Sequence, residues 1–463
     1  MVVVVVLVVV LIVSLLAGVH RYVWLRLVRD TTGRGSTVRR IGTAAVWVLP
    51  LLSVGALVSG RAGAPFWLER ALAWPGFLWL ATLLYLVLAL LAAEAARPLL
   101  RRALERRANA RTDRVAVAAA PPQAAGPASV PAADLVSAPA GTPGASAVGG
   151  VLAAEATTTE TGDTRPADDS TPVIPPAESP SVPPVPEPAV SRRLFVSRLV
   201  GGAAAAAAVG TVGHGTYGVL RGPRIKRVTV PLAKLPRAAH GYRIAVVSDI
   251  HLGPILGRAH TQRIVDSINA AQPDLVAVVG DLVDGSVEDL GPAAEPLAQL
   301  RSRHGSYFVT GNHEYFSGAD AWVDHVRGLG LRPLRNERVQ IAGFDLAGVD
   351  DVAGENEGQG PDFAKALGDR DRSRAAVLLA HQPVVIHDAV DHGVDLQLSG
   401  HTHGGQLWPG NYLAELANPT VAGLERYGDT QLYVTRGAGA WGPPVRVGAS
   451  SDITVVQLAS RQA

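Results

Sequence analysis

The sequence predicts an α/β domain over about residues 242–460, preceded by a membrane region and a linker. Short apolar runs rich in Val, Leu and Ile alternate there with segments of helical periodicity, which is typical of α/β folds. Asp, Asn and His side chains follow directly after these apolar runs. Because ligands of α/β folds bind at the carboxyl ends of strands, the second observation also predicts where a functional site lies.

The composition excludes several classes of protein before any motif is considered. The chain has 463 residues, of which 48% are hydrophobic, so it is not disordered throughout and has room for about three domains. It contains no Cys, which excludes a disulfide scaffold, a Cys-based zinc site and a thiol nucleophile. The net charge of +2 is the sum of four blocks of opposite sign: residues 1–114, 115–190, 191–240 and 241–463 carry +10, −7, +9 and −10.

Three uncharged apolar runs near the amino terminus predict transmembrane helices. They cover about residues 2–19, 41–60 and 71–93 of a membrane region that extends over residues 1–114. A bilayer core of about 30 Å requires roughly 20 apolar residues in a helix, so each run is long enough to span it. The first run lacks a basic segment before it and a small-residue cleavage site after it, which disfavours a secretory signal.

Arginines beside these runs predict the orientation in the membrane. Six arginines lie between the first and second runs, two lie between the second and third, and seven lie in residues 97–114. Positive residues stay on the cytoplasmic side of a membrane, so we expect the amino terminus outside and residue 97 onward inside. A nucleic-acid-binding patch is the less favoured interpretation, because the arginines directly adjoin the spans.

Residues 115–190 predict a disordered linker. This segment holds 15 of the 33 prolines and no aromatic residue. Ala, Pro, Ser and Thr with scattered acids bury too little apolar surface to offset the entropy cost of ordering. We expect a spacer with stretches of polyproline II, and a proline-rich recognition ligand is the alternative.

Residues 191–220 predict an export signal or an anchor helix. The octapeptide Ser-Arg-Arg-Leu-Phe-Val-Ser-Arg at 191–198 precedes an uncharged, alanine-rich stretch and resembles a twin-arginine signal, which implies the twin-arginine translocase as a partner. An ordinary fourth transmembrane helix is the alternative, and both interpretations place the following domain outside. No Ala-x-Ala site follows the alanine run, so we expect an uncleaved anchor. Four basic residues after the stretch oppose this orientation: Arg221, Arg224, Lys226 and Arg227.

Within the α/β domain, five apolar runs predict buried strands and two periodic segments predict helices. The predicted strands are residues 244–248, 275–279, 307–309, 376–379 and 396–398. The predicted helices are residues 261–271, with Ile264, Val265 and Ile268 on one face, and 319–329, with Trp322, Val326 and Leu329 inward.

Each predicted strand is followed by side chains of metal-binding types. In chain order these are Asp249 and His251, Asp281 and Asp284, Asn312 and His313, His381, and His401 and His403. A single histidine is more often a surface or core residue than a ligand, but five successive strand ends with the same feature favour a metal site. Carboxylate oxygens and neutral imidazoles suit Mn, Fe or Zn.

Such a set of ligands suits the hydrolysis of a phosphate ester. Two divalent ions roughly 3.5–4 Å apart, joined by a bridging carboxylate, can activate water and bind a phosphoryl group. The leaving oxygen also needs a proton donor, which an unliganded histidine at the edge of the cluster would supply.

In their order and spacing, these five motifs resemble those of the calcineurin-like metallophosphoesterase family, over about residues 242–460. The resemblance implies two packed mixed sheets flanked by helices, an α/β/β/α sandwich, and a hydrolase acting on ester bonds. It also implies two divalent metal ions. The first would be bound by Asp249, His251 and His403, the second by Asn312, His381 and His401, and both by Asp281.

The same resemblance assigns roles to the remaining motif residues. His313 would be the general acid and would also contact the phosphate, while Asp284 would orient a neighbouring histidine. Glu314 would have a structural role. The other histidines of the domain are not expected to bind metal: His260, His304, His325, His387 and His392.

Flanking residues narrow the resemblance to a bacterial membrane-associated branch of the family. They are His-Thr-His-Gly-Gly-Gln at 401–406, Tyr-Val-Thr-Arg-Gly at 433–437 and Trp-Gly-Pro-Pro at 441–444. Members of that branch are often anchored by amino-terminal helices or exported through a twin-arginine signal. The two glycines of the first segment would leave the backbone open to a ligand, or form a plain turn. Arg436 is a candidate phosphate contact, with a solvated arginine as the alternative.

The leading expectation is therefore a membrane-tethered, extracytoplasmic phosphoesterase with two metal ions. Its substrate would be a phosphodiester or pyrophosphate, either small or linked to a lipid or the cell wall. A nuclease of the same fold is disfavoured, because the net charge of −10 on residues 241–463 would repel a nucleic acid. A non-catalytic metal-binding sensor or transporter is disfavoured, because the three predicted spans contain no acidic, basic or histidine residue.

Overall fold

The computed structural model describes residues 2–119 and 192–462. Contacts divide the chain into one unit of Met1–Leu100 with Val190–Ala463 and a second unit of Arg101–Ala189. Of the second unit, only the end of a helix, up to Ala119, is described. The predicted linker therefore lies outside the described residues, except that 115–119 continue this helix.

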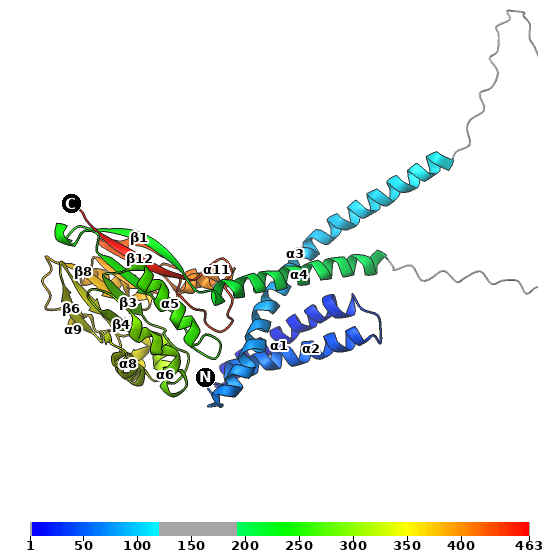
Figure 1. Cartoon of the computed structure of the whole chain (residues 1–463). Coiled ribbons are helices and arrows are strands. Elements are labelled where there is room, and N and C mark those ends of the chain that lie inside the picture. The colour runs from blue at the N-terminus through cyan, green and yellow to red at the C-terminus, as the bar shows by residue number, and fades with distance from the viewer. Residues whose placement is uncertain (1, 120–191, 463) are drawn as a thin grey trace, which may run out of the picture. The chain divides into compact units, whose positions relative to one another are not determined.

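Four long helices carry the apolar runs (Figure 1). They are α1 (Val2–Val23), which a π-helical turn η1 (Trp24–Arg29) extends, α2 (Thr37–Val58), α3 (Phe66–Ala119) and α4 (Arg192–Leu220). Four segments of the described chain are long and apolar enough to cross a membrane: Val6–Arg29, Thr37–Val58, Phe66–Leu99 and Leu194–Leu220.

Two of these helices, α2 and α3, pack closely against each other. A Cβ atom at Gly76 of α3 would lie 2.5 Å from the carbonyl oxygen of Leu52, so this approach requires a glycine. Ser53 of α2 donates a hydrogen bond of 2.8 Å to the carbonyl oxygen of Gly76. Small residues at such an interface are typical of helices that pack in a membrane.

Charged side chains cluster where three segments of this region meet. Arg26 of η1 lies 2.9 Å from Glu94 of α3, and Arg97 lies 3.1 Å from the same carboxylate. Arg198, in the second turn of α4, donates to the carbonyl oxygen of Thr31 at 3.0 Å. These contacts join η1, α3 and α4 at one polar end.

Residues 224–460 form two six-stranded mixed sheets. The first has the order β1 (Arg224–Leu232), β12 (Asp452–Ser460), β2 (Arg243–Val247), β3 (Leu275–Val279), β4 (Ser306–Val309) and β5 (Leu331–Pro333). The second has the order β10 (Gly423–Tyr427), β11 (Thr430–Val434), β9 (Leu396–Ser399), β8 (Ala375–Leu379), β7 (Phe344–Gly348) and β6 (Glu337–Ile341). β2 to β5 run parallel, as do β7, β8, β9 and β11, whereas β6, β10 and the β2–β12 pair are antiparallel.

The strands and helices expected from the apolar runs are all found at or near their predicted positions. They are β2, β3, β4, β8 and β9, with α5 (Arg258–Ala271) and α8 (Ala319–Gly328). The domain also contains α6 (Val287–Ala294), α7 (Asn312–Ser317), α9 (Phe363–Leu367), α10 (Ile386–Asp391) and α11 (Gly410–Ala417).

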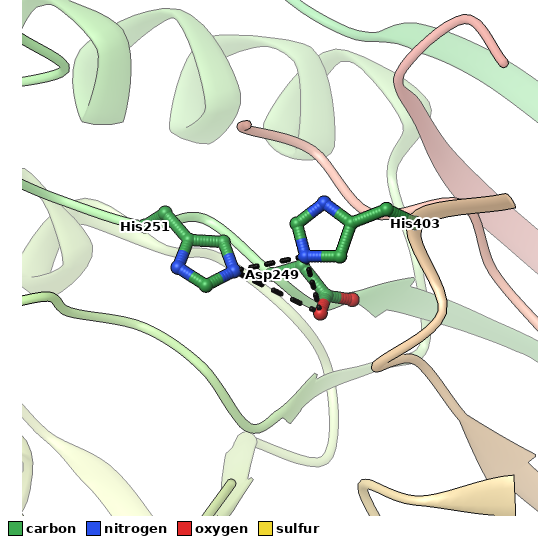
Figure 2. A group of neighbouring side chains, drawn as sticks. All are labelled: Asp249, His251 and His403. Carbon is green, nitrogen blue, oxygen red and sulfur yellow. Dashed lines mark hydrogen bonds and ion pairs between the residues drawn. The ribbon is translucent and has the colours of Figure 1, made fainter. Parts of the chain in front are cut away.

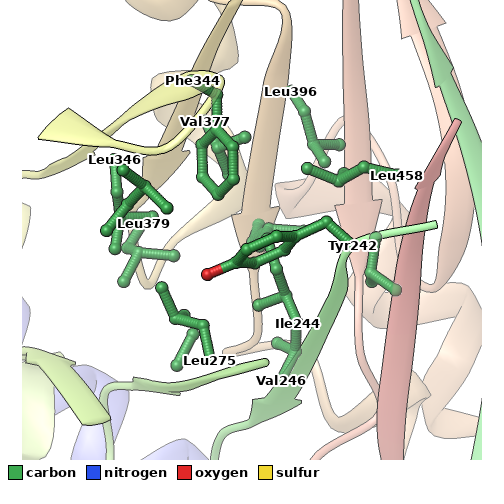
Figure 3. Close-up of a cluster of buried hydrophobic side chains, with 14 of the residues drawn as sticks. Tyr242, Ile244, Val246, Leu275, Phe344, Leu346, Val377, Leu379, Leu396 and Leu458 are labelled. Atoms are coloured by element: carbon green, nitrogen blue, oxygen red, sulfur yellow. The ribbon is translucent and has the colours of Figure 1, made fainter. Parts of the chain in front are cut away.

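The main core lies between the two sheets (Figure 3). Ile244, Val246 and Leu275 of the first sheet face Phe344 and Val377 of the second, and all five are fully buried. Burying a side chain of this size contributes about 1.5–3 kcal/mol, so this layer accounts for much of the stability.

Helices cover the outer face of each sheet. α5, α6 and α8 pack on the first sheet through residues such as Ile264, Leu290 and Trp322. α9 and α10 pack on the second sheet through Phe363 and Ile386. The arrangement is an α/β/β/α sandwich, which confirms the predicted fold class.

Candidate metal centre

The loops after five strands meet at one edge of the sandwich. Asp249 and His251 follow β2, and Asp281 follows β3, its parallel neighbour. Asn312 begins α7 after β4, while His381 follows β8, and His401 and His403 follow β9. The carboxyl ends of parallel strands lie at the same edge of a sheet, so the topology gathers the donors of each sheet. The packing of the two sheets then brings both groups together.

Several of these residues have strained backbone conformations. Eight non-glycine residues of the described chain have positive φ, and five of them belong to the predicted site: Asp249, His251, Asp281, His401 and His403. Their φ values lie between 49° and 71°. Conformations of this kind cost about 1–3 kcal/mol each and persist where the surrounding structure holds them, which is common at functional sites.

The first set of converging donors is Asp249, His251 and His403 (Figure 2). One ligand atom from each lies within 4.8 Å of the others, and all three residues are buried. Nε2 of His251 is 3.0 Å from Nε2 of His403, which is 3.3 Å from Oδ1 of Asp249. Two imidazole nitrogens that point toward each other beside a buried carboxylate fit the ligands of one cation.

The second set is Asp281, His381 and His401, whose ligand atoms also lie within 4.8 Å of one another. Nδ1 of His381 donates to the carbonyl oxygen of Val279 at 2.9 Å, so Nε2 faces the set. That buried nitrogen lies 3.1 Å from Oδ2 of Asp281 but has no partner of hydrogen-bonding geometry among the described residues. A buried nitrogen of this kind, fixed through its other ring nitrogen, fits a metal ligand.

Asn312 lies beside the second set, and Asp281 connects this set to the first. Oδ2 of Asp281 is 3.1 Å from Nε2 of His381 and 3.8 Å from Nε2 of His251. Oδ1 of Asn312 is 3.1 Å from Nδ1 of His401. Asp281 thus lies between the two sets, where a bridging carboxylate would have to lie.

Burial and charge set the protonation of these donors. Burial lowers the pKa of His401 and His403 to about 4, so both imidazoles are neutral at pH 7. Burial alone would also lower the pKa of His251, but the carboxylate of Asp284 raises it to about 9. Burial opposes the ionisation of Asp281, yet His381 lowers its pKa to about 2. Ionised carboxylates and neutral imidazoles fit divalent ions such as Mn, Fe or Zn, so a bound ion would displace the proton that His251 carries at pH 7.

Asp284 joins the first set to His313. Its Oδ1 accepts hydrogen bonds of 2.8 Å from Nδ1 of His251 and of His313. Burial raises the pKa of Asp284, but the two histidines lower it below its usual value. His313 was not predicted to bind metal, although one of its ring nitrogens lies within 4.8 Å of ligand atoms of His251 and Asp281. Its ring stands between Phe316 and Trp441, with centroid distances of 5.6 Å and 5.8 Å.

Glu314 ties α7 to the loop after β3. Its buried carboxylate accepts hydrogen bonds from the backbone N–H groups of Gly311 at 2.6 Å, Asp281 at 2.9 Å and Leu282 at 2.8 Å. Burial and the carboxylate of Asp281 raise the pKa of Glu314 to about 7. Because it fixes backbone on both sides of the site, its contacts suit the structural role expected for it.

Sequence reasoning missed Arg446, whose buried guanidinium supports His403. Its Nη1 donates to the carbonyl oxygen of His403 at 2.9 Å, and its Nη2 lies 3.2 Å from Nδ1 of the same histidine. Its Nε donates to the carbonyl oxygen of Gly439 at 2.8 Å. The only signal in the sequence is that Arg446 follows Trp-Gly-Pro-Pro-Val closely, which does not indicate a contact with His403.

Gly404, Gly405 and Arg436 lie against other parts of the protein, whereas the sequence suggested that they adjoin a ligand. A Cβ atom at Gly405 would lie 2.2 Å from the backbone nitrogen of Asn411, so the chain itself requires a glycine there. At Gly404 a Cβ atom would lie 3.0 Å from Cγ of Arg436, whose half-buried stem packs beside it. The contact of Arg436 with a phosphate stays a prediction.

The histidines that were not expected to bind metal lie outside both donor sets. His304 stacks on Tyr242 at 5.4 Å, His325 contacts Trp322 at 5.4 Å, and the other three are His260, His387 and His392. His260 is 1% exposed, and neither of its ring nitrogens has a hydrogen-bond partner among the described residues.

Comparison with known proteins places this site in a family context. Residues 242–405 match the family model described as calcineurin-like phosphoesterase. The chain is 40% identical over 259 residues to the Danio rerio protein named "Transmembrane protein with metallophosphoesterase domain", an alignment that covers 53% of this chain and 59% of that one. The chain thus spans less than two thirds of that vertebrate relative.

Two bacterial relatives are covered more fully. Identity to an uncharacterized metallophosphoesterase of Helicobacter pylori is 39% over 255 residues, which cover 54% of this chain and 68% of the relative. Identity to an uncharacterized metallophosphoesterase of Aquifex aeolicus is 34% over 240 residues, which cover 51% of this chain and 91% of the relative.

Proposed function

Since the chain belongs to the calcineurin-like phosphoesterase family, we propose that it is a membrane-tethered hydrolase that uses two metal ions to cleave a phosphate ester. The observation that carries this proposal is the pair of donor sets that adjoin at Asp281, with His313 beside them at the rim. The substrate would be a phosphodiester or a pyrophosphate.

Each donor set would hold one cation. Asp249, His251 and His403 would bind the first, and Asn312, His381 and His401 would bind the second, with Asp281 shared between them. Bound divalent ions would supply the positive charge that activates a water molecule and polarises a phosphoryl oxygen. The protein's part is to fix the donors, which it does through strained turns and through hydrogen bonds to the outer ring nitrogens.

His313 would protonate the leaving group. In hydrolysis the oxygen of water forms a bond to phosphorus, and the bond from phosphorus to the leaving oxygen breaks. The leaving oxygen then needs a proton. Because Nδ1 of His313 is held by Asp284 at 2.8 Å, Nε2 is the ring nitrogen that can donate this proton. His313 would also contact the phosphate, as the resemblance implies.

We propose that the catalytic domain lies on the extracytoplasmic face. The arginine-rich segments support this orientation, because Arg26, Arg97 and Arg198 gather at one polar end of the helices. A twin-arginine translocase would be the partner for export of the segment that begins at Arg192. A tag inserted at residue 150 should be protected from an impermeant label in intact cells, and labelling there would contradict this topology.

Metal content and turnover of the full chain test the proposed activity. Purified protein should contain Mn, Fe or Zn by elemental analysis and should hydrolyse bis(4-nitrophenyl) phosphate or 4-nitrophenyl phosphate. A chelator should abolish turnover, and added metal should restore it. Asp281→Ala should lose both metal and turnover, whereas the exposed control Asp324→Ala should keep both. Bound metal without turnover on either ester would instead favour a metal-binding sensor.

A further inference from the structure

A cavity of about 630 Å³ connects the candidate metal centre to the membrane helices. One side of the cavity is formed by His251, Asp284 and His313, which belong to the site described above. The opposite side is formed by the end of α2 and the first part of α3, including Leu57 and Phe77. The catalytic groups and two candidate membrane spans therefore share one cavity.

The wall that leads away from the metal centre is largely apolar. Phe316 and Trp441 pack on the ring of His313, yet they remain 70% and 51% exposed. Leu256 and Leu80 also line the cavity. Exposed apolar surface of this kind beside His313 favours a ligand with an apolar group.

Loops of the catalytic domain lie along the candidate spans well beyond their ends. Tyr85 of α3 donates a hydrogen bond of 2.9 Å to the carbonyl oxygen of Trp408. Val445 is buried against Leu86 of α3 and Val212 of α4. Arg70 is the charged residue directly before the predicted span 71–93. Tyr85 follows it by 15 positions, which corresponds to about 22 Å along a helix. The cavity beside Phe77 therefore lies next to the apolar part of α3.

Charged groups occupy the same cavity beside its apolar wall. Arg61 and Glu69 line it near the connection between α2 and α3, and Asp289 lines it from the catalytic domain. Arg61 also donates to the carbonyl oxygen of Leu57 at 3.2 Å. A cavity with a metal centre at one side, a guanidinium nearby and an apolar wall on membrane helices matches an amphipathic anion. Its phosphoryl group and its hydrocarbon chain would each meet a suitable surface.

We propose that the substrate is a membrane lipid phosphate ester or pyrophosphate, whose phosphoryl group lies at the metal centre and whose hydrocarbon chain lies against Leu57, Phe77 and Leu80. This inference rests on the proposed phosphoesterase activity and adds the substrate class. Water would add to phosphorus, the bond to the leaving oxygen would break, and that oxygen would take a proton from His313. A soluble or cell-wall ester would need no such wall.

Two probes with the same reacting group test this inference. They are hexadecyl 4-nitrophenyl phosphate and ethyl 4-nitrophenyl phosphate, and both release 4-nitrophenol on hydrolysis. The full chain is reconstituted in phosphatidylcholine nanodiscs, and kcat/KM is measured for each. We expect a preference for the hexadecyl ester of about tenfold or more, because burial of each methylene group is favourable.

Substitutions in the cavity wall separate binding in the cavity from partition into the bilayer. Leu57→Trp narrows the cavity and should lower the preference for the hexadecyl ester about tenfold, since a filled wall excludes the chain. Leu80→Trp should act in the same direction. Leu51→Trp is the matched control on α2, because Leu51 is 69% exposed and does not line the cavity, and it should keep the wild-type preference. Bound metal, measured on each variant, shows that the catalytic domain is folded.

The outcomes distinguish the two proposals. Equal kcat/KM on both esters would overturn the lipid inference and leave the phosphoesterase activity standing, as a soluble or cell-wall substrate requires. A hexadecyl preference that Leu57→Trp and Leu80→Trp leave unchanged would also overturn it, because the bilayer alone would then cause the preference. No turnover of either ester by metal-loaded protein would contradict the proposed function itself.

Discussion

Oδ1 of Asp284 lies 2.8 Å from Nδ1 of His313, and the same oxygen accepts from Nδ1 of His251 at the same distance. One carboxylate oxygen therefore orients both a predicted metal ligand and the predicted general acid. Such partners of catalytic histidines fix ring orientation and tautomer. The candidate metal site and the predicted proton donor are thus held in a single arrangement.

Substitution of this carboxylate should impair both functions. Asp284→Asn keeps the size of the side chain but removes its charge, so both histidines lose a strong acceptor. We expect a loss of about 10–100-fold in kcat/KM or in metal affinity, which is typical when such a partner is removed. Steady-state kinetics and metal titration measure it, with the exposed Asp324→Asn as control. Unchanged values in both assays would show that Asp284 does not orient these rings.

His313→Ala should separate chemistry from metal binding. His313 belongs to neither predicted ligand set, so elemental analysis should find wild-type metal, while turnover falls by about 10²–10⁴-fold. The loss should be larger for an alkyl leaving group than for 4-nitrophenolate, because the latter needs no proton to depart. His387→Ala, at an exposed position, is the control. Equal losses of turnover for both leaving groups would contradict the role of His313 as the general acid.

Metal affinity should rise with pH between 7 and 9. The carboxylate of Asp284 raises the pKa of His251 to about 9, although burial opposes this, so a proton competes with the cation below that pH. When metal binding displaces one proton, the apparent metal affinity falls about tenfold for each unit by which the pH is lowered. Mn²⁺ titration of the apoprotein measures the slope, which should be shallower in Asp284→Asn. A flat profile in the wild type would contradict the assigned protonation.

His260 should make the fold sensitive to acid. Burial, together with Arg263 and Arg446, lowers its pKa to about 4, whereas an unfolded chain has the ordinary value near 6.5. Between these values the unfolded state binds a proton that the folded state does not, so stability is present above pH 6.5 and falls as the pH drops toward 4. Across this pH range the free energy of unfolding decreases by about 3 kcal/mol in total.

The test of this effect is a pair of melting curves. His260→Leu removes the titrating group, so its Tm should fall less than that of the wild type between pH 7 and pH 5. His387→Leu, at an exposed position, should follow the wild type. Parallel pH profiles of Tm for wild type and His260→Leu would mean that another group governs acid sensitivity.

The strand ends could be predicted because their signal is local. A buried parallel strand is a short apolar run, and the polar residues after it lie at the edge where neighbouring strands also end. Asp249 follows such a run directly, and Asp281 and His381 each follow theirs after one intervening residue. Convergence within one sheet, as for Asp249 and Asp281, therefore followed once the runs were identified as neighbouring strands, whereas the approach of His381 depended on how the second sheet packs on the first.

Other elements gave no such signal. β1 mixes Arg224, Lys226 and Arg227 with apolar residues. It pairs with β12 (Figure 1), and Arg224 lies opposite Asp452 in this pair. A strand whose partner lies more than 200 residues away is determined by packing against that partner and not by its own composition. The contact between Arg446 and His403 could not be predicted for the same reason, because it depends on how distant segments pack.

The sequence by itself determined the α/β class, the apolar helices and the identity of the donor side chains, because each depends on composition and spacing within a short segment. Only the tertiary structure decided that Asp284 accepts hydrogen bonds from two histidines, that Arg446 contacts His403, and that a cavity joins the candidate metal centre to Leu57 and Phe77. These relationships depend on distances between segments far apart in the chain, which follow from how the two sheets and the helices pack together.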